Sequence, residues 1–305
     1  MPPRDQLRAL VVAVVWGLNF PATVITLEHF PPMLMVALRF TLVAVPALVL
    51  VPRPDVPLRW LLGVGVGMGL LQFAFLYLGM AAGMPSGLAS LVLQASAPFT
   101  VLLAGLWLRE RLTRRQSLGI AVAVLGLVVI AVHRAQVAAL LPVVLTLCGA
   151  LGWAFGNVCS RQARAPQPFH LTLWMSVVPP VPMLVLSLLV EGPHRVGEAL
   201  RTSLTLAALP SLLALLYIVV VATLLGHGLW NSLLSHYPSS LVAPFSMLVP
   251  IVGVLSSWLF FGELIDLAEL VAGAAVVGGV LLGSRPPRRT ASLPQPETPV
   301  PVGIR

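Results

Sequence analysis

An aromatic ring and a side-chain amide stand close together at three places in the sequence. They are Trp16 with Asn19, Trp153 with Asn157, and Trp230 with Asn231. In a helix, residues three or four positions apart lie on the same face, so the first two pairs present a ring and an amide together. An indole ring offers a broad apolar wall, and an amide offers hydrogen bonds without a fixed charge. This combination favours a binding site for a small molecule with an apolar part and a hydrogen-bonding head.

Three other side chains extend this candidate site. Arg39 is the only basic residue well inside an apolar run, and it either contacts a substrate or gate, or pairs with a backbone carbonyl or Glu28. His227 is either a proton relay or a neutral histidine that is hydrogen-bonded between helices. Tyr77 adds a phenol ring to the set. For all the aromatic residues, the alternative is an anchoring role at a membrane surface.

The sequence lacks the residue patterns of common enzymes. There is no lysine, which excludes Walker A loops and Schiff-base lysines, and there is no H-E-x-x-H metal motif. The segment Gly83–Gly87 (GMPSG) is not a nucleophile elbow, because its serine is displaced. Cys148 and Cys159 have no histidine at ligand spacing. We therefore predict neither an enzyme nor a bound metal or cofactor.

Composition assigns the chain to a class. Of its 305 residues, 58% are hydrophobic and only 9% are charged, and the mean hydropathy is +0.97. A soluble domain carries about 25% charged residues, so a soluble enzyme is excluded. The net charge of +8 comes from arginines between apolar runs, where charge sets membrane orientation, so no nucleic-acid partner is expected. The chain is predicted to be an all-α polytopic membrane protein in a lipid bilayer.

Ten apolar runs are predicted to span this bilayer, since a spanning helix needs about 20 mainly apolar residues. They cover residues 7–27, 33–51, 60–82, 85–108, 117–132, 141–160, 170–190, 210–234, 240–261 and 267–283. The runs form two blocks of five, residues 7–132 and 141–283. Residues 284–305 are rich in proline and polar side chains, and we expect a disordered cytoplasmic tail there.

The arginines predict the orientation of these spans. With the N-terminus inside, fourteen arginines fall in cytoplasmic segments, and only Arg134, Arg195 and Arg201 fall outside. This asymmetry follows the positive-inside rule and supports an even number of spans. Both termini are therefore expected in the cytoplasm, and the membrane is expected to be the bacterial inner membrane. The longest connection, residues 191–209, has room for a small interfacial helix.

The two blocks are related by an internal repeat. At one constant offset, Tyr77 corresponds to Trp230, Pro85 to Pro238, Glu110 to Glu263, and Gly126 to Gly279. Five helices are an odd number, so the second block must lie inverted relative to the first. Inverted repeats are typical of alternating-access carriers, whose substrate site lies near the midplane between the halves. Pro98 and Pro250 fall inside the fourth and ninth spans, where a proline can supply a hinge.

Motifs in both blocks are specific enough to suggest a family. They are the W-G-x-N opening at Trp16, Leu38-Arg39-Phe40, Tyr77 followed by Pro85-Ser86-Gly87, Pro98, Arg109-Glu110-Arg111-Leu112, and Phe261-Gly262-Glu263. Over residues 8–283 the chain resembles the EamA family of the drug/metabolite transporter superfamily, and it is similar to amino-acid exporters of the YddG type. The resemblance implies a central cavity between spans one to four and six to nine, with spans five and ten at the periphery. Met175 stands where the second copy would repeat Arg39.

The resulting hypothesis is an inner-membrane carrier that exports amino acids or related small metabolites by alternating access through a central, mainly apolar cavity. The alternatives are an intramembrane enzyme, a channel, or a carrier of the same superfamily for another substrate class, such as drugs or sugar derivatives. Small residues at four-residue spacing allow helices to approach closely, either within a monomer or in a homodimer. Such spacing is found at Gly65 and Gly69 and at Ala275, Gly279 and Gly283.

Carboxylates are expected at the ends of the spans rather than inside them. Glu110 and Glu263 end the fourth and ninth spans, where they pair with arginines or cap neighbouring helices. With no carboxylate on the pathway, transport is expected to be facilitative, or proton-coupled at most through His227.

Overall fold

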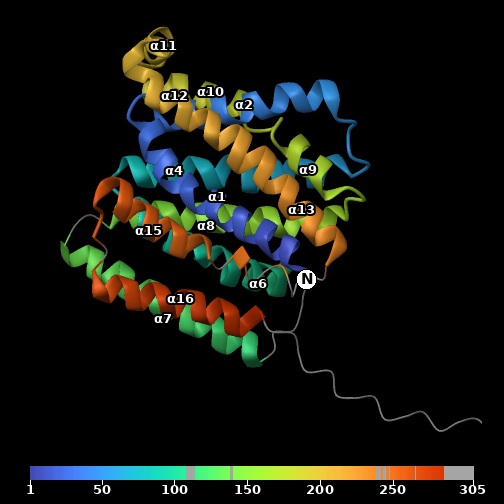
Figure 1. The fold of residues 1–305 in the computed structure, drawn as a ribbon, viewed down its shortest axis with the longest axis vertical. Helices are drawn as coiled ribbons and strands as arrows, with labels where there is room; N and C mark the ends of the chain where they lie inside the picture. Colours follow the sequence, from blue (N-terminus) through green and yellow to red (C-terminus); the bar gives the residue numbers. More distant parts are fainter. Residues whose placement is uncertain are drawn as a thin grey trace, which may run out of the picture.

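All the regular secondary structure that the structure describes is helical. The computed structural model describes residues 1–107, 114–137, 140–237, 242, 245–246, 248–264 and 266–284, and no strand is formed among them (Figure 1). Helices satisfy their backbone hydrogen bonds internally, which is the condition for crossing a bilayer. In Figure 1, α7 (Arg114–Val137) and α16 (Leu267–Ser284) lie side by side along one edge, and α11 (Pro193–Thr202) lies at the opposite corner.

Within the described residues, seven helical stretches are long and apolar enough to cross a membrane. Three of them are single helices, namely α1 (Pro3–Leu27), α2 (Pro32–Leu50) and α8 (Leu141–Ala163). The third span joins α3 (Leu58–Val64), the π-helix η1 (Gly65–Leu71) and α4 (Gln72–Ala81), and the fourth joins α5 (Ser86–Val92), the 3₁₀ turn η2 (Leu93–Ala95) and α6 (Ser96–Trp107).

The other two spans lie in the second half. One joins α9 (Pro168–Met175), α10 (Pro180–Leu186) and the π-helix η3 (Ser187–Glu191). The other joins η4 (Leu206–Ala208), α12 (Leu209–Leu216), the π-helix η5 (Tyr217–Leu225) and α13 (Gly226–His236). Shorter apolar stretches, Ser117–Ile130, Val249–Phe261 and Leu267–Leu282, lie in α7, α15 (Val249–Phe261) and α16.

These elements agree with the sequence-based expectations at the level of the fold class. Each predicted apolar run contains helix where it is described, which confirms an all-helical polytopic membrane protein. The number of ten crossings and the inversion of the halves stay predictions. The helix α11 occupies the predicted connection 191–209. Glu110 and the tail from residue 285 onward lie outside the described residues.

One expectation about carboxylates is wrong. Glu269 lies inside the tenth apolar run, in the first turn of α16, and is only 3% exposed. A carboxylate is stabilised in the first turn of a helix, where the unpaired N–H groups and the helix dipole carry partial positive charge. Because α16 contributes no residue to the cavity described below, Glu269 is placed away from that pathway.

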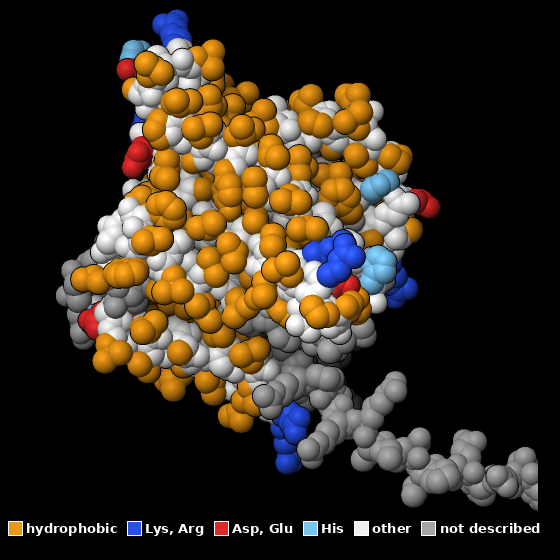
Figure 2. Space-filling model, in the orientation of Figure 1, with side chains coloured by type: hydrophobic (Ala, Val, Ile, Leu, Met, Phe, Trp, Pro, Cys, Tyr) orange, Lys and Arg blue, Asp and Glu red, His pale blue; other side chains and the backbone are white. Residues whose placement is uncertain are grey.

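The surface of the protein is largely apolar. Figure 2 shows hydrophobic side chains covering the visible face, while the charged side chains gather toward its margins. Large exposed residues such as Leu48, Val49 and Leu189 belong to the predicted spans. A water-soluble monomer rarely exposes a continuous apolar area of more than a few hundred Å². Such a surface suits contact with lipid hydrocarbon.

The third span packs against α8 with almost no side chain between them. A Cβ atom on Gly67 would lie 2.5 Å from the backbone nitrogen of Gly156, and one on Gly152 would lie 2.9 Å from the backbone nitrogen of Gln72. Both obstacles are backbone atoms, which cannot rotate away. The glycines of η1 and α8 are therefore required for the distance between these two helices.

The predicted small-residue faces are used inside the chain. Gly279 of α16 and Gly126 of α7 each face backbone oxygens of the other helix, at 2.5 Å from a hypothetical Cβ. In the same way, Gly65 faces Val178 and Gly69 faces Pro179. These contacts account for Gly65, Gly69 and Gly279 within one chain, and the oligomeric state stays open.

Hydrogen bonds at the helix ends join the two halves of the chain. The Glu263 carboxylate, just after α15, accepts two backbone N–H bonds at the start of α5, including one from Ser86 (3.2 Å). The Glu191 carboxylate accepts two backbone N–H bonds at the start of α2, the shorter from Met33 (2.7 Å). These bonds confirm the predicted capping role of Glu263.

A third bond joins the halves at the other end of the bundle. The Tyr237 hydroxyl, just after α13, donates to the Asp5 carboxylate at the start of α1 (2.6 Å). This hydrogen bond raises the pKa of the Tyr237 phenol. The three connections place the start of α1 and the end of α13 at one end of the bundle, and the starts of α2 and α5 at the other. That arrangement agrees with helices that alternate in direction.

Two of the three π-helices described, η1 and η5, provide a structural counterpart to the internal repeat. The offset that carries Tyr77 onto Trp230 also carries η1, residues 65–71, onto residues 218–224, which lie within η5. A π-helix widens the hydrogen-bonding step to five residues and shifts the side chains that follow it to another face, and π segments are frequent at functional sites. The helices η1 and η5 therefore interrupt their spans at equivalent positions of the sequence repeat.

We predict that Gly67→Ala destabilises the protein and that Gly278→Ala does not. A Cβ at Gly67 would meet backbone atoms of α8, whereas a Cβ at Gly278, in α16, meets no atom within 4 Å. Overpacking of this kind costs about 1–3 kcal/mol, while alanine in an open helical position stabilises by about 0.5–1 kcal/mol. Thermal unfolding of the purified variants in detergent measures both effects. Equal melting temperatures would contradict the close packing of the third span on α8.

Candidate functional site

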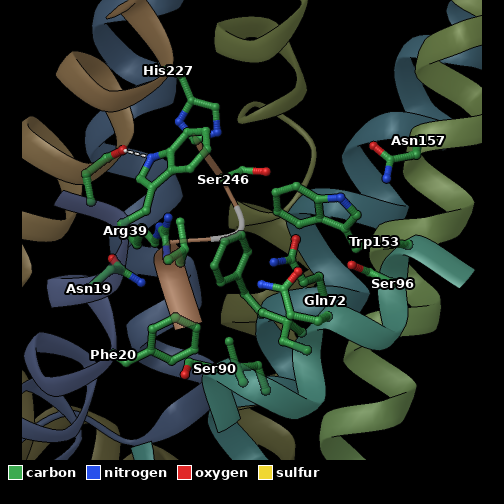
Figure 3. A pocket seen from close by; sticks show the side chains of 18 residues that line it. Asn19, Phe20, Arg39, Gln72, Ser90, Ser96, Trp153, Asn157, His227 and Ser246 are labelled. Carbon is green, nitrogen blue, oxygen red and sulfur yellow. Dashed lines mark hydrogen bonds between the residues drawn. The ribbon is translucent and has the colours of Figure 1, made fainter. Parts of the chain in front are cut away.

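A cavity of about 270 Å³ lies between the two halves of the chain (Figure 3). The first half contributes residues from α1, α2, α4, and α5 through α6, and the second half contributes residues from α8, η5, α13 and α15. None of the described side chains of α7 and α16 lines the cavity, which agrees with the peripheral position that the family resemblance implies for spans five and ten. The seventh span, α9 to η3, does not line it either.

Trp16 forms one wall of the cavity and is held in place by the second half. Its indole N–H donates to the backbone oxygen of Ala222 in η5 (3.0 Å). Its ring lies 5.2 Å from the ring of His227 and 5.3 Å from the ring of Trp230. A Cβ on Gly226 would come within 2.5 Å of the indole nitrogen, so glycine at that position makes room for Trp16.

His227 lies on the cavity wall (Figure 3), and its ring contacts the ring of Trp16. Its Nδ1 is 3.0 Å from the backbone oxygen of Thr223, one turn earlier in the helix. A carbonyl oxygen can only accept, so Nδ1 carries the proton in this bond. In the neutral ring, Nε2 is then an acceptor. The ring is therefore oriented by its own helix.

Arg39 is buried, with 4% of its surface exposed, and it joins three elements. One terminal nitrogen donates to the hydroxyl of Tyr77 in α4 (2.6 Å), and the other donates to the hydroxyl of Thr223 in η5 (3.2 Å). The guanidinium carbon lies 3.9 Å from the ring centroid of Phe73, a cation–π contact. A charge at the centre of a bilayer costs about 2.5–3.5 kcal/mol, and these contacts offset part of that cost.

No carboxylate pairs with Arg39 within the part of the chain that the structure describes. The pairing with Glu28 that was one alternative is not formed; the partners of Arg39 are two hydroxyl groups and an aromatic ring. The Nε–H group of Arg39 is buried and has no hydrogen-bond partner. The cavity wall therefore carries a positive charge that is not neutralised.

Several amides and hydroxyls complete the wall. Asn157 donates to the hydroxyl of Thr100 across α8 and α6 (3.2 Å). The side-chain oxygens of Asn19 and Gln72 are buried without a hydrogen-bond partner. Gln72 is 2% exposed and directly follows the π-helix η1. The cavity thus combines aromatic walls with amides that have unused hydrogen-bonding capacity.

The structure brings together six of the nine predicted binding residues. Those on the cavity wall are Trp16, Asn19, Arg39, Trp153, Asn157 and His227. The other three, Tyr77, Trp230 and Asn231, do not line it. Tyr77 is completely buried and hydrogen-bonds Arg39, which lies between it and the cavity. Trp230 packs behind Trp16, which occupies the space toward the cavity.

The two predicted hinge prolines differ in their setting. Pro98 is buried in the first turn of α6, and because the fourth span is already helical before it, its missing N–H does interrupt the regular hydrogen bonds of that span. Pro250 instead lies in the first turn of α15, where a proline removes no helical hydrogen bond. Pro250 therefore lies inside the predicted ninth span, at the start of a helix rather than in its middle. A hinge role for either proline stays a prediction.

Sequence reasoning did not find Gln72 and Thr223. Both are polar residues inside predicted spans, and that signal alone marks a position facing protein or water rather than lipid. Thr223 accepts a hydrogen bond from Arg39 and donates to the backbone oxygen of Ile218 five residues earlier. Among the described residues, no group of three or more potential metal ligands is found.

Comparison with known proteins identifies the family. Residues 6–132 and 140–285 match the sequence model of the EamA-like transporter family. A protein of Salmonella typhimurium (strain LT2) named "Probable amino-acid metabolite efflux pump" is 42% identical over 288 residues, which cover 92% of this chain and 95% of that protein. The protein of the same name from Escherichia coli (strain K12) is 38% identical with the same coverage.

A solved crystal structure supports the fold. It covers 93% of this chain and 98% of its own chain with a TM-score of 0.59, at 19% sequence identity, so the likeness concerns the fold alone. The family and the two relatives are transporters or pumps and not enzymes. Because the family model matches both halves of the sequence over nearly its whole length, the chain belongs to the EamA-like transporter family.

Proposed function

We propose that this protein exports amino acids or related small metabolites across the membrane by alternating access. The observation that carries the proposal is the cavity, which both halves build around a buried arginine that has no carboxylate partner among the described residues. Two relatives of this chain are named amino-acid metabolite efflux pumps, which supports the same substrate class.

The size and chemistry of the cavity support a metabolite rather than a drug. Its volume of about 270 Å³ lies just below the roughly 300–1,000 Å³ of pockets for drug-sized ligands. Trp16 and Trp153 offer apolar walls for a side chain, and the Arg39 guanidinium attracts a carboxylate. With wide aromatic walls, the site tolerates several side chains of similar size.

Alternating access requires two units that can move against each other. We infer ten spanning helices in two inverted five-helix units, residues 7–132 and 141–283. The π-helices η1 and η5 at equivalent repeat positions support this relation. The cavity between the units is where an inverted-repeat carrier holds its substrate. We place the protein in the bacterial inner membrane with both termini in the cytoplasm, because most arginines then fall on the cytoplasmic side.

A channel is the second candidate function for such a cavity. The two differ in kinetics, because a carrier must return before it transports again, whereas a channel passes solute continuously. Exchange of labelled for unlabelled amino acid that saturates with concentration supports the carrier. Flux that rises linearly with concentration would support the channel instead.

Replacing the cavity tryptophans is expected to impair transport. In liposomes loaded with unlabelled amino acid, Trp16→Ala and Trp153→Ala should reduce the exchange of labelled L-alanine, L-serine or L-leucine about tenfold, since each removes an aromatic wall of the cavity. Trp258→Ala is the matched control, because Trp258 is 56% exposed on α15 and does not line the cavity. Equal, small effects of all three changes would mean that the rings only anchor the protein in the membrane.

The proposed orientation can be tested with single cysteines in a variant that lacks Cys148 and Cys159. A Cβ atom added at Gly197 in α11 would have no other atom within 4 Å, so Gly197→Cys should fold and face outward. Gln167, which is exposed between α8 and α9, should face the cytoplasm. An impermeant maleimide added to intact cells should label Gly197→Cys but not Gln167→Cys. The reverse pattern would invert the topology.

A further inference from the structure

Three buried polar atoms on the cavity wall have no hydrogen-bond partner. They are Asn19 Oδ1, Arg39 Nε and Gln72 Oε1. Across the described residues, no other buried side-chain nitrogen or oxygen lacks a partner, and these three all line the same cavity. Buried polar groups are normally satisfied, because leaving one unpaired costs free energy. The three unpaired atoms therefore indicate which hydrogen-bonding groups a bound molecule has to carry.

The unmet groups are of two chemical kinds. Arg39 Nε is a donor on a positive charge, so it calls for an anionic acceptor such as a carboxylate. Asn19 Oδ1 and Gln72 Oε1 are neutral acceptors, so they call for N–H or O–H donors. In Figure 3, Arg39 and Asn19 lie on one side of the cavity and Gln72 lies on the other. A molecule between them must carry a carboxylate and a donor group close together.

Gln72 is held rigidly enough to select such a donor. Its backbone N–H bonds to the oxygen of Gly67 in the π-helix η1. Its backbone oxygen and nitrogen lie against Gly149 and Gly152 of α8, each 2.9 Å from a hypothetical Cβ on those glycines. With 2% of its surface exposed, its oxygen cannot exchange freely with bulk water. An ammonium group forms stronger, charge-assisted bonds to such an oxygen than a hydroxyl does.

We propose that Gln72 is a specificity-determining residue whose Oε1 accepts a hydrogen bond from the α-ammonium group of the substrate, while the carboxylate of the same molecule faces Arg39. The cavity then selects zwitterions over simple carboxylic acids and over simple amines. This inference rests on the proposed function, because it describes how the same cavity recognises an amino acid.

Competition in the liposome assay tests this selection. The labelled substrate is whichever of L-alanine, L-serine and L-leucine exchanges fastest. Its competitors are the unlabelled amino acid, the same acid without its amino group, and the same amino acid as its carboxamide. In the wild type, the acid without the amino group should compete at least about tenfold more weakly than the amino acid, because it leaves Gln72 Oε1 unpaired.

The variants separate a binding role from a packing role. Gln72→Met keeps the length of the side chain and removes the acceptor, so the preference for the amino group should fall to near one, while the preference for carboxylate over carboxamide should persist. Gln72→Glu keeps acceptor oxygens and should keep the preference for the amino group. Gln167→Met is the control, because Gln167 is exposed outside the spans, and it should behave as the wild type.

Two failures can be told apart. If the wild type exchanges no amino acid, the proposed function is overturned, and this inference falls with it. If the wild type exchanges amino acids but does not discriminate against the acid without the amino group, only this inference is overturned, whether or not Gln72→Met folds. The same holds if Gln72→Met folds and keeps the full preference.

Discussion

The burial of one positive charge organises the centre of this protein. Arg39 replaces its lost hydration with the Tyr77 hydroxyl, the Thr223 hydroxyl and the face of Phe73. Two of these groups come from α4 and one from η5, so both halves of the chain contact the guanidinium. Neutral partners stabilise the guanidinium without cancelling its charge. An internal carboxylate would have formed an ion pair and left the cavity without attraction for an anion.

The irregular parts of the helices are what bring the polar groups to this charge. In η5, the Thr223 hydroxyl bonds back to Ile218 and still accepts from Arg39, while the Ala222 oxygen is left to accept the indole N–H of Trp16. In the first half, η1 ends just before Gln72 and packs closely against the glycines of α8. A regular α-helix would pair these carbonyl groups within the helix and would aim the following side chains elsewhere.

Hydropathy and spacing could predict the helices and part of the site. They could not predict that the two halves contribute different residues around Arg39. Trp16 with Asn19 and Trp153 with Asn157 follow from helix periodicity, and both pairs reach the cavity. Repeat symmetry wrongly assigned Tyr77 a place on the cavity wall. Tyr77 hydrogen-bonds Arg39 instead, and the predicted repeat places Met175, not a second arginine, at the position equivalent to Arg39. Such pairings depend on π-helix geometry and on contacts between distant segments, which a local pattern does not contain.

The connections between the halves fit the proposed transport cycle. Glu263 and Glu191 hold the starts of α5 and α2 at one end of the bundle, and the Tyr237–Asp5 bond holds the other end. All of these are hydrogen bonds to carboxylates at the helix ends, where water can replace the lost partner when a bond opens. The cavity centre lacks that freedom, since breaking the Arg39 contacts inside the membrane would leave a charge unsolvated. In the proposed alternating-access cycle, we therefore expect the bonds at the two ends to open in turn while the contacts of Arg39 are kept.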